Sequence, residues 1–300
     1  CNIKNNLLIM NRLRKHIDKS IIDEIYSYFS QFSTKNKLNL PVIYNEDTKQ
    51  YIDYSCILKD KITGKILTVI IYDQDDKDIH TILNDNGELL LNGFSRYYSK
   101  KRSFFYNGFS NTTKPKSYSG INWLCGYQRY LHPIEKKQMI NYHKRNNKAD
   151  EDDEFLKAYL KVYCGIYHLE KKYLPKLAEE RLKLCKLSPF AKNFPIELNP
   201  ATTLGGSINF SNKPHADSCK KGMYESIIFK QRSDIDYIFC NYYANVEYKI
   251  KGCCIIFQDG KILHGTKNTG NHEGIGFVNI TKSNLVCNTD YTDELISNIL

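Results

Sequence analysis

Two short segments in the last third of the chain carry residues that could hold a metal ion. The first contains Pro214, His215 and Asp217, and the second contains His264. Two imidazoles and one carboxylate form the ligand set that holds non-haem Fe(II) on one face and leaves the other face open. Residues i and i+2 of an extended segment point to the same side, so His215 and Asp217 could both reach one ion. The sequence therefore predicts a metal site at His215, Asp217 and His264.

The His-x-Asp triplet by itself carries little information. With 8 histidines in 300 residues, about 0.5 such triplets are expected by chance. A second copy occurs at His16 to Asp18. That copy lies in a basic stretch, residues 7–25, whose apolar periodicity is typical of a surface helix. The surrounding elements must therefore separate the two copies.

The elements around His215 and His264 are predicted to be short strands. Alternating apolar and polar residues over 202–210 indicate a half-buried strand, and Pro214 marks its end because proline cannot donate to a sheet ladder. Residues 249–257 are typical of a turn followed by a buried strand, and residues 258–261 of a tight turn before His264. Residues 274–280 indicate a further strand. Candidate ligands at the ends of such strands predict a jelly roll, a double-stranded β-helix.

The order of these motifs resembles one enzyme superfamily. A strand, Pro-His-x-Asp-Ser, a second strand, Leu-His-Gly-Thr and a Gly-Ile-Gly strand resemble the Fe(II)/2-oxoglutarate-dependent dioxygenases, and most closely the Tet/JBP-like oxygenases of the transposon-associated type. The resemblance covers residues 120–285. It implies an α+β fold with a jelly-roll core and supporting helices. It also implies Fe(II) and 2-oxoglutarate as cofactors, with His215, Asp217 and His264 as metal ligands.

One position departs from the family pattern. The resemblance implies an Arg, sometimes a Lys, about ten residues after the second histidine, where its charge pairs with the far carboxylate of 2-oxoglutarate. Gly274 stands at that position, and Glu273 precedes it. Lys267, His272 and Lys282 are the residues that could substitute from another direction. Either the chain anchors its co-substrate differently, or it has lost catalysis.

Composition and length limit the possible fold and the number of domains. The hydrophobic content of 41%, with 13% aromatic residues, is ample for a packed core. A length of 300 residues allows one domain or two. We expect a jelly-roll dioxygenase domain over residues 116–300. Residues 1–115 form an N-terminal α/β extension that is either a separate domain or an integral part of the same core.

Cysteine usage and hydropathy predict an intracellular protein. The ten cysteines contain no CxxC pair, which argues against zinc fingers and a disulfide scaffold and favours reduced, buried thiols. Cys219, two residues after Asp217, is expected to line the site rather than bind the metal. No apolar run approaches the ~18 residues that span a membrane, so we expect a soluble protein with no membrane partner.

The remaining segments allow a coarse assignment. Residues 5–33 are predicted to be helical, residues 51–73 to form a hairpin around Lys61–Gly64, and residues 88–94 to be strand-rich. Residues 134–187 are predicted to be helical, with a break at Pro175 and acidic residues 150–154 at a helix start. The histidines of this region, His132, His143 and His168, are interpreted as surface or packing residues.

Residues 94–118 form a basic, aromatic segment that is the candidate nucleic-acid contact. Lys100, Lys101 and Arg102 could bind phosphates while Tyr and Phe side chains stack on exposed bases. The alternative is a strand pair with core aromatics and solvated lysines. The formal net charge of +10 slightly favours the first interpretation, in which the partner is a polyanion.

Two classes of function follow from these observations. The first is a dioxygenase that hydroxylates a C–H bond, with the methyl group of 5-methylcytosine in nucleic acid as the favoured substrate. The base specificity is implied by the resemblance alone. A protein or small-molecule hydroxylase on the same fold is the near alternative, because fold does not fix substrate. The second class is a catalytically degenerate relative that binds nucleic acid or protein. A nuclear location is expected if nucleic acid is the partner.

Overall fold

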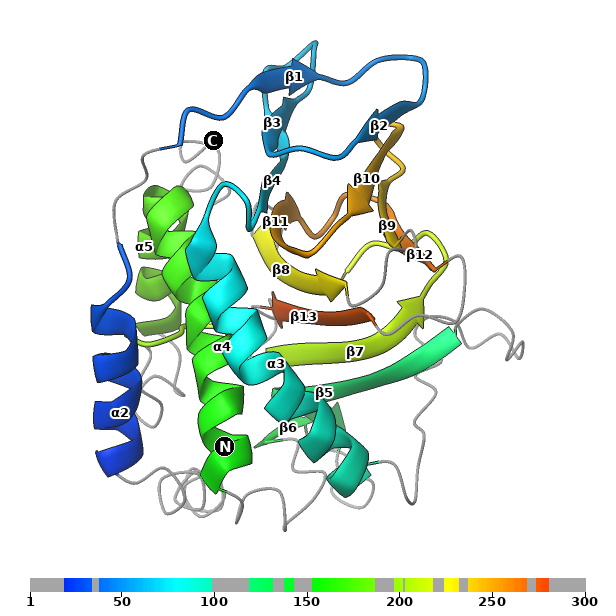
Figure 1. Cartoon of the computed structure of the whole chain (residues 1–300). Helices are drawn as coiled ribbons and strands as arrows, with labels where there is room; N and C mark the ends of the chain where they lie inside the picture. The colour runs from blue at the N-terminus through cyan, green and yellow to red at the C-terminus, as the bar shows by residue number, and fades with distance from the viewer. Residues whose placement is uncertain are drawn as a thin grey trace.

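A computed structural model of the chain describes residues 19–33, 38–98, 119–131, 138–142, 153–186, 197–201, 203–217, 224–231, 237–268 and 274–280. The chain is an α+β protein with two β-sheets (Figure 1). The helices are α2 (Lys19–Ser30), α3 (Lys77–Tyr98), α4 (Asp153–Tyr173) and α5 (Pro175–Lys186). The strands are β1 (Val42–Tyr44), β2 (Gln50–Ile52), β3 (Cys56–Lys59), β4 (Ile66–Tyr72), β5 (Ser119–Leu131), β6 (Gln138–Tyr142), β7 (Thr203–Ser211), β8 (Tyr224–Gln231), β9 (Tyr237–Asn241), β10 (Val246–Ile250), β11 (Cys253–Asp259), β12 (His264–Asn268) and β13 (Gly274–Ile280).

The larger sheet has nine strands in the order β1-β3-β4-β11-β8-β13-β7-β5-β6, and the smaller sheet has four in the order β12-β9-β10-β2. The pairs β4–β11, β11–β8, β8–β13 and β13–β7 are all antiparallel. From the first quarter of the chain, β4 pairs with β11 and β2 pairs with β10, both from the last third, while β3 pairs with β4 and β1 with β3. The N-terminal strands therefore extend both sheets.

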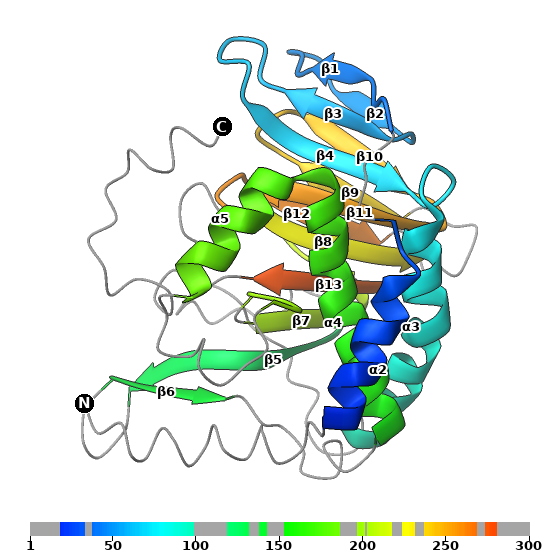
Figure 2. The same cartoon turned by 90° about the vertical axis from the view of Figure 1, so that its left-hand side faces the viewer.

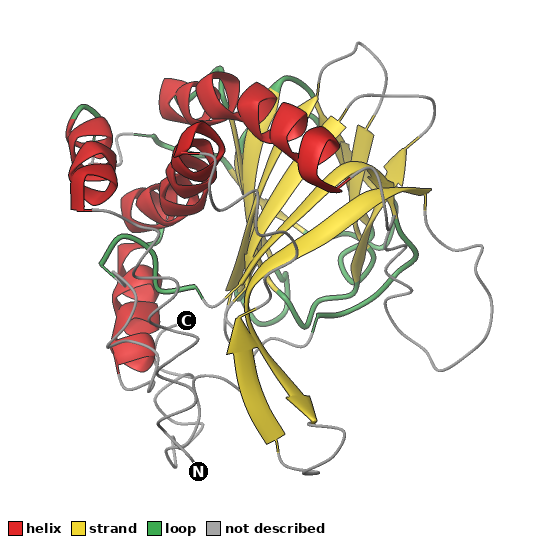
Figure 3. Ribbon diagram, turned by 90° about the horizontal axis from the view of Figure 1, so that it is seen from below, coloured by secondary structure: helices red, strands yellow, loops and turns green. Residues whose placement is uncertain are grey.

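Alternation along the central strands builds two cores. On β11, Cys253, Ile255 and Phe257 belong to the core that faces the helices, whereas Cys254 and Ile256 belong to the core between the two sheets. Figures 2 and 3 show the helices on one side of the large sheet and the small sheet on its other side. Both faces of β11 are therefore dry, and its seven residues are all buried.

The prediction of a strand over residues 88–94 was wrong, because this segment is the second half of α3. The side chains of Ile79, Ile82, Leu83 and Leu90 are fully buried, and their spacing of three, one and seven residues is helical. This helix packs on α4 at Gly165, where an added Cβ would lie 2.8 Å from the Ile82 side chain. The helical spacing of the buried residues, rather than the short apolar run at residues 89–91, therefore determines the element.

The prediction that the chain becomes helical from residue 134 was also wrong in part. Residues 138–142 form strand β6, paired with β5, before α4 begins at Asp153. The break at Pro175 is confirmed, since Leu174 separates α4 from α5, and Asp153 and Glu154 lie in the first turn of α4. The hairpin of β3 and β4 around Lys61–Gly64 is confirmed.

Other predictions are settled only for the described residues. The predicted helix over residues 5–33 is present as α2, and its earlier part lies outside the described residues. Of the basic, aromatic segment, residues 94–98 end α3 and residues 99–118 lie outside the described residues. Among the described side chains, free buried cysteines occur at Cys56, Cys164, Cys240, Cys253 and Cys254. No helix in the described ranges is both long and apolar enough to cross a membrane.

Candidate metal centre

The structure brings His215, Asp217 and His264 together at the edge of the four-stranded sheet. One ligand atom from each residue lies within 4.8 Å of the other two. Asp217 Oδ2 lies 3.6 Å from His264 Nε2, and the two imidazole centroids are 4.4 Å apart. His264 is buried, whereas His215 and Asp217 are half-buried. The strand contexts predicted for both segments are present, as β7 before His215 and as β12 beginning at His264.

Backbone hydrogen bonds hold the two segments in register. The His215 N–H donates to the His264 carbonyl at 2.9 Å, and the His264 N–H donates back to the His215 carbonyl at 2.8 Å. The Asp217 N–H donates to the carbonyl of Gly260 at 2.7 Å. The segment after β7 thus runs antiparallel to the start of β12, with an isolated bridge between the two histidines. The i and i+2 side chains then face the partner histidine from one side.

Two backbone carbonyls orient the imidazoles. His264 Nδ1 lies 2.9 Å from the Ile262 carbonyl, and His215 Nδ1 lies 3.0 Å from the Lys213 carbonyl. A neutral imidazole that donates from Nδ1 keeps its lone pair on Nε2, which is the atom available to a metal. The ring of Phe239 stacks on His264 with centroids 5.8 Å apart. The Nε2 of His264 thus faces Asp217, whereas Asn212 Nδ2 lies 3.3 Å from both ring nitrogens of His215, so a metal bound at His215 Nε2 would displace this amide contact.

Electrostatics favours the protonation states that a metal requires. Burial and the neighbouring His264 lower the pKa of His215 below its ordinary value, although Asp217 acts in the opposite sense. Burial alone would raise the pKa of Asp217. A hydrogen bond and the charge of His264, the charge of His215 and a hydrogen bond with Glu225 together lower it below its ordinary value. Neutral His215 and ionised Asp217 at neutral pH form a donor set that fits Fe(II).

A row of buried polar side chains on neighbouring strands lies beside these ligands. The sequence pattern did not reveal it. Gln258 on β11 has Thr68 of β4 and Glu225 of β8 as its cross-strand partners, and all three are at most 1% exposed. Asn241, paired with His264 across β9 and β12, donates from Nδ2 to Thr68 Oγ1 at 3.1 Å. Within the described part of the chain, neither amide atom of Gln258 has a hydrogen-bond partner. The row therefore contains an orphaned amide on the inter-sheet side of β11.

The position expected to carry a co-substrate cation is occupied by Gly274, the buried first residue of β13. Lys267 does not replace it. On β12, side chains alternate, and the buried His264 and Thr266 face away from Lys267. Lys267 instead forms an ion pair with Glu247, and its Nζ lies 6.0 Å from the centre of the Tyr242 ring.

Among the residues predicted around the site, His272, Lys282 and Cys219 lie outside the described residues. Of the histidines interpreted as packing residues, His168 is buried on α4 and its ring stacks on Phe29 at 5.4 Å. His132 and His143 also lie outside the described residues. The residues that are described thus support the metal ligands but supply no anchor for the far carboxylate of 2-oxoglutarate at Gly274 or Lys267.

Comparisons with known proteins bear on the fold. No protein-family model and no curated protein matches the chain. Among solved structures, the chain is similar to one described as NgTET1 in complex with 5mC DNA. The TM-score is 0.54 at 12% sequence identity, over 93% of this chain and 95% of that chain. At this identity the likeness concerns the fold alone, and in its overall fold the chain is therefore TET-like.

Proposed function

We propose that the chain is an Fe(II)- and 2-oxoglutarate-dependent dioxygenase that hydroxylates a C–H bond. The observation that carries the proposal is the meeting of His215, Asp217 and His264 within 4.8 Å. The core would be a double-stranded β-helix. Its support is the antiparallel order β7-β13-β8-β11 in the large sheet, facing β12-β9-β10 in the small sheet.

In this proposal the three side chains hold the metal on one face. Bound iron with 2-oxoglutarate supplies the oxidising power. The chain itself contributes position: the Lys213 and Ile262 carbonyls keep both imidazoles oriented, and Glu225 hydrogen-bonds Asp217 from the buried row. Ligands fixed in this way lose little freedom when the metal binds.

We propose 5-methylcytosine in nucleic acid as the substrate class. The TET-like fold and the net charge of +10 support it. In a duplex, the methylated base would have to leave the stack to reach the iron. Residues 94–118, with Lys100, Lys101 and Arg102, are the proposed phosphate contacts. An intracellular, nuclear protein would meet such a substrate.

Anaerobic metal titration tests the iron site. We expect purified chain to bind Fe(II) and to develop the weak visible charge-transfer band when 2-oxoglutarate is added. His215→Ala and Asp217→Ala should each abolish iron binding, since the loss of one of three ligands leaves an incomplete face. The matched control is Asp53→Ala, which changes an exposed carboxylate that belongs to neither metal-binding group. Normal iron binding by either ligand variant would refute the assignment.

Turnover and DNA binding are tested separately. Succinate release that depends on 5-methylcytosine DNA would support the substrate class. Replacing Lys100, Lys101 and Arg102 by alanine should lower DNA affinity and flatten its dependence on salt, because fewer counterions are then released. An unchanged salt slope would exclude this segment as a phosphate contact.

The second candidate is a catalytically degenerate binding protein, and Gly274 is the observation that favours it. Such a protein would bind DNA or a protein partner, and would release no succinate with any methylated DNA even when loaded with Fe(II). A protein or small-molecule hydroxylase would release succinate only with a substrate of that class. The same succinate assay therefore separates the three functions.

A further inference from the structure

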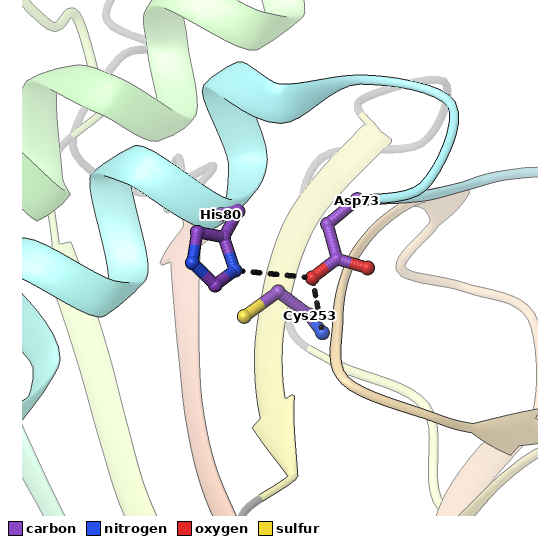
Figure 4. A group of neighbouring side chains, drawn as sticks. All are labelled: Asp73, His80 and Cys253. Atoms are coloured by element: carbon purple, nitrogen blue, oxygen red, sulfur yellow. Dashed lines mark hydrogen bonds and ion pairs between the residues drawn. The ribbon is translucent and has the colours of Figure 1, made fainter.

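A second group of metal-binding side chains lies on the helix-facing side of the large sheet. Asp73 follows the last residue of β4, His80 lies in the first turn of α3, and Cys253 opens β11 (Figure 4). One ligand atom from each residue lies within 4.8 Å of the other two. The carboxylate is half-buried, the imidazole is exposed and the thiol is buried. Cys253 is distant in sequence from Asp73 and His80, and the pairing of β11 with β4 brings it to them.

The backbone holds Asp73 and Cys253 side by side. The Asp73 N–H donates to the Cys253 carbonyl at 2.9 Å, and the Cys253 N–H donates to Asp73 Oδ2 at 3.2 Å. The turn before β11 contains Gly252 at φ 56°, a left-handed conformation that side chains rarely adopt. A Cβ there would lie 3.2 Å from Asp73 Oδ1. Glycine therefore lets this turn approach the carboxylate closely.

The spacing of the Asp73 and His80 side chains matches two ligands of one ion. Asp73 Oδ2 and His80 Nδ1 are 3.4 Å apart, whereas a charge-assisted hydrogen bond is shorter, at ~2.7–2.9 Å. Metal–ligand bonds of ~2.0–2.1 Å in a tetrahedron put the oxygen and nitrogen ~3.3 Å apart. The observed separation thus matches the spacing of two ligands of one cation, and in the metal-free chain the same atoms form a long ion pair.

The donor types select the ion. We propose that Asp73, His80 and Cys253 bind Zn²⁺ or a similar borderline-soft divalent cation, with water in the fourth position. A thiolate excludes the hard cations Mg²⁺ and Ca²⁺, and thiolate, imidazole and carboxylate are all ligands of zinc. The ion would join the start of α3 to β4 and β11. Zinc in this position would be a structural ion, here called the clip. This proposal does not depend on the proposal of an iron site.

Metal binding at Cys253 requires loss of the thiol proton. Burial, with a smaller contribution from Asp73, raises the pKa of Cys253 to about 12. The thiol is therefore neutral at pH 7 until a metal displaces its proton. Lys230, opposite Cys253 on β8, is already engaged with Asn84 at 3.1 Å and Glu88 at 3.6 Å on α3.

The clip is separate from the iron site. Cys253 and Asp259 lie at opposite ends of β11. At a rise of ~3.3 Å per residue, the length of the strand between them is ~20 Å. Cys253 faces the helices, whereas Gln258, beside the iron ligands, shares the other face of β11 with Cys254. One ion could not serve both groups.

Cobalt(II) titration of the metal-free full chain tests the proposal. We expect one equivalent of Co²⁺ to give a thiolate-to-metal charge-transfer band in the near ultraviolet, and Zn²⁺ to bleach it. The iron ligands His215, Asp217 and His264 contain no thiolate, so they do not produce this band. Cys253→Ser should remove the band, and Cys254→Ser, the adjacent buried thiol facing the other way, should retain it.

His80→Ala keeps the test decisive if Cys253→Ser fails to fold, since His80 is exposed. We expect this variant to bind Co²⁺ at least ~10-fold more weakly while retaining its circular dichroism spectrum. Absence of the band in the unaltered chain, its persistence in Cys253→Ser, or unchanged affinity in His80→Ala would each overturn the zinc assignment.

Discussion

At the scale of single residues, the side chain of Gln258 has surroundings that packing alone does not explain. Its amide is fully buried, and the described residues offer neither amide atom a hydrogen-bond partner. An unsatisfied buried amide costs about 1–3 kcal/mol. We therefore expect Gln258→Met, a replacement of similar length, to raise the free energy of unfolding of the metal-free protein by about 1–3 kcal/mol.

Urea unfolding measures this change, and Thr68→Val is the matched control. Thr68 is the cross-strand neighbour of Gln258, but its hydroxyl accepts a hydrogen bond from Asn241. Its loss should lower stability by about 1–2 kcal/mol. If Gln258→Met lost stability as well, the amide would have a partner such as an ordered water. A lower rate of succinate release in Gln258→Met would assign the amide to ligand binding.

The buried His168 predicts a pH dependence of stability. Burial, and then the charge of Lys171, lower the pKa of His168 in the folded state below its ordinary value of 6.5. Above pH 6.5 the imidazole is neutral in both states. Below it the unfolded state binds the proton first, so the folded state loses stability down to the folded pKa, with a slope of at most ~1.4 kcal/mol per pH unit.

His168→Gln removes this titration and isolates its effect. The difference in unfolding free energy between the unaltered chain and the variant should shrink as the pH falls from 7.5 to 5, as measured by urea unfolding at each pH. A difference that stays constant over this range would show that His168 carries the same pKa in both states.

Which site residues can be predicted from the sequence depends on how far apart they lie along the chain. His215 and Asp217 share one extended segment, and the resemblance named His264, so all three candidate ligands were predicted before the fold was known. Gln258 looked like part of a tight turn, although it is a buried residue of β11. The group of Asp73, His80 and Cys253 depends on the pairing of β4 with β11, which no local pattern encodes.

At the scale of elements, both strands and helices were predicted in part. The strand over residues 274–280 and the hairpin of β3 and β4 are present, because alternation and Gly-containing turns are local signals. The segment that became the second half of α3 was assigned to a strand. Its burial pattern is set by contact with α4 and the sheet, which a short window cannot reveal.

A buried ion pair connects α5 to α4 and the sheet. Arg181 Nε lies 2.9 Å from Glu170 Oε1, both side chains are at most 1% exposed, and Ser226 Oγ donates to the other carboxylate oxygen at 3.3 Å. Arg181→Leu leaves a carboxylate buried without its cation, which should cost about 3–5 kcal/mol of stability. Replacing Glu170 by leucine as well should recover much of that loss.

Lys183→Leu on the same helix is the control for this element. Its side chain is exposed and pairs with Glu179 and Glu180 within α5, so its loss should change the unfolding free energy by less than about 1 kcal/mol. Equal effects of Arg181→Leu and Lys183→Leu in thermal or urea unfolding would contradict a special role for the buried pair.

At the scale of the whole molecule, the two sheets draw on both ends of the chain. Ile52, Leu58 and Ile70 from the first quarter share the inter-sheet core with Phe239 and Ile256 from the last third. Strand β4 also covers the edge of β11 that would otherwise be unpaired. These contacts favour residues 1–115 as an integral part of the core, one of the two alternatives that the sequence left open.

Dividing the chain at residue 115 therefore tests its domain organisation. We predict that residues 116–300 alone expose the edges of β11 and β10 and the face that α3 covers, and so fail to unfold cooperatively. The single tryptophan, Trp123, lies in this fragment and reports on it by fluorescence during urea unfolding. Co-expression with residues 1–115 should restore one cooperative transition, coincident with that of the full chain by circular dichroism. A fragment 116–300 that unfolds cooperatively and binds Fe(II) by itself would instead make the first 115 residues a separate domain.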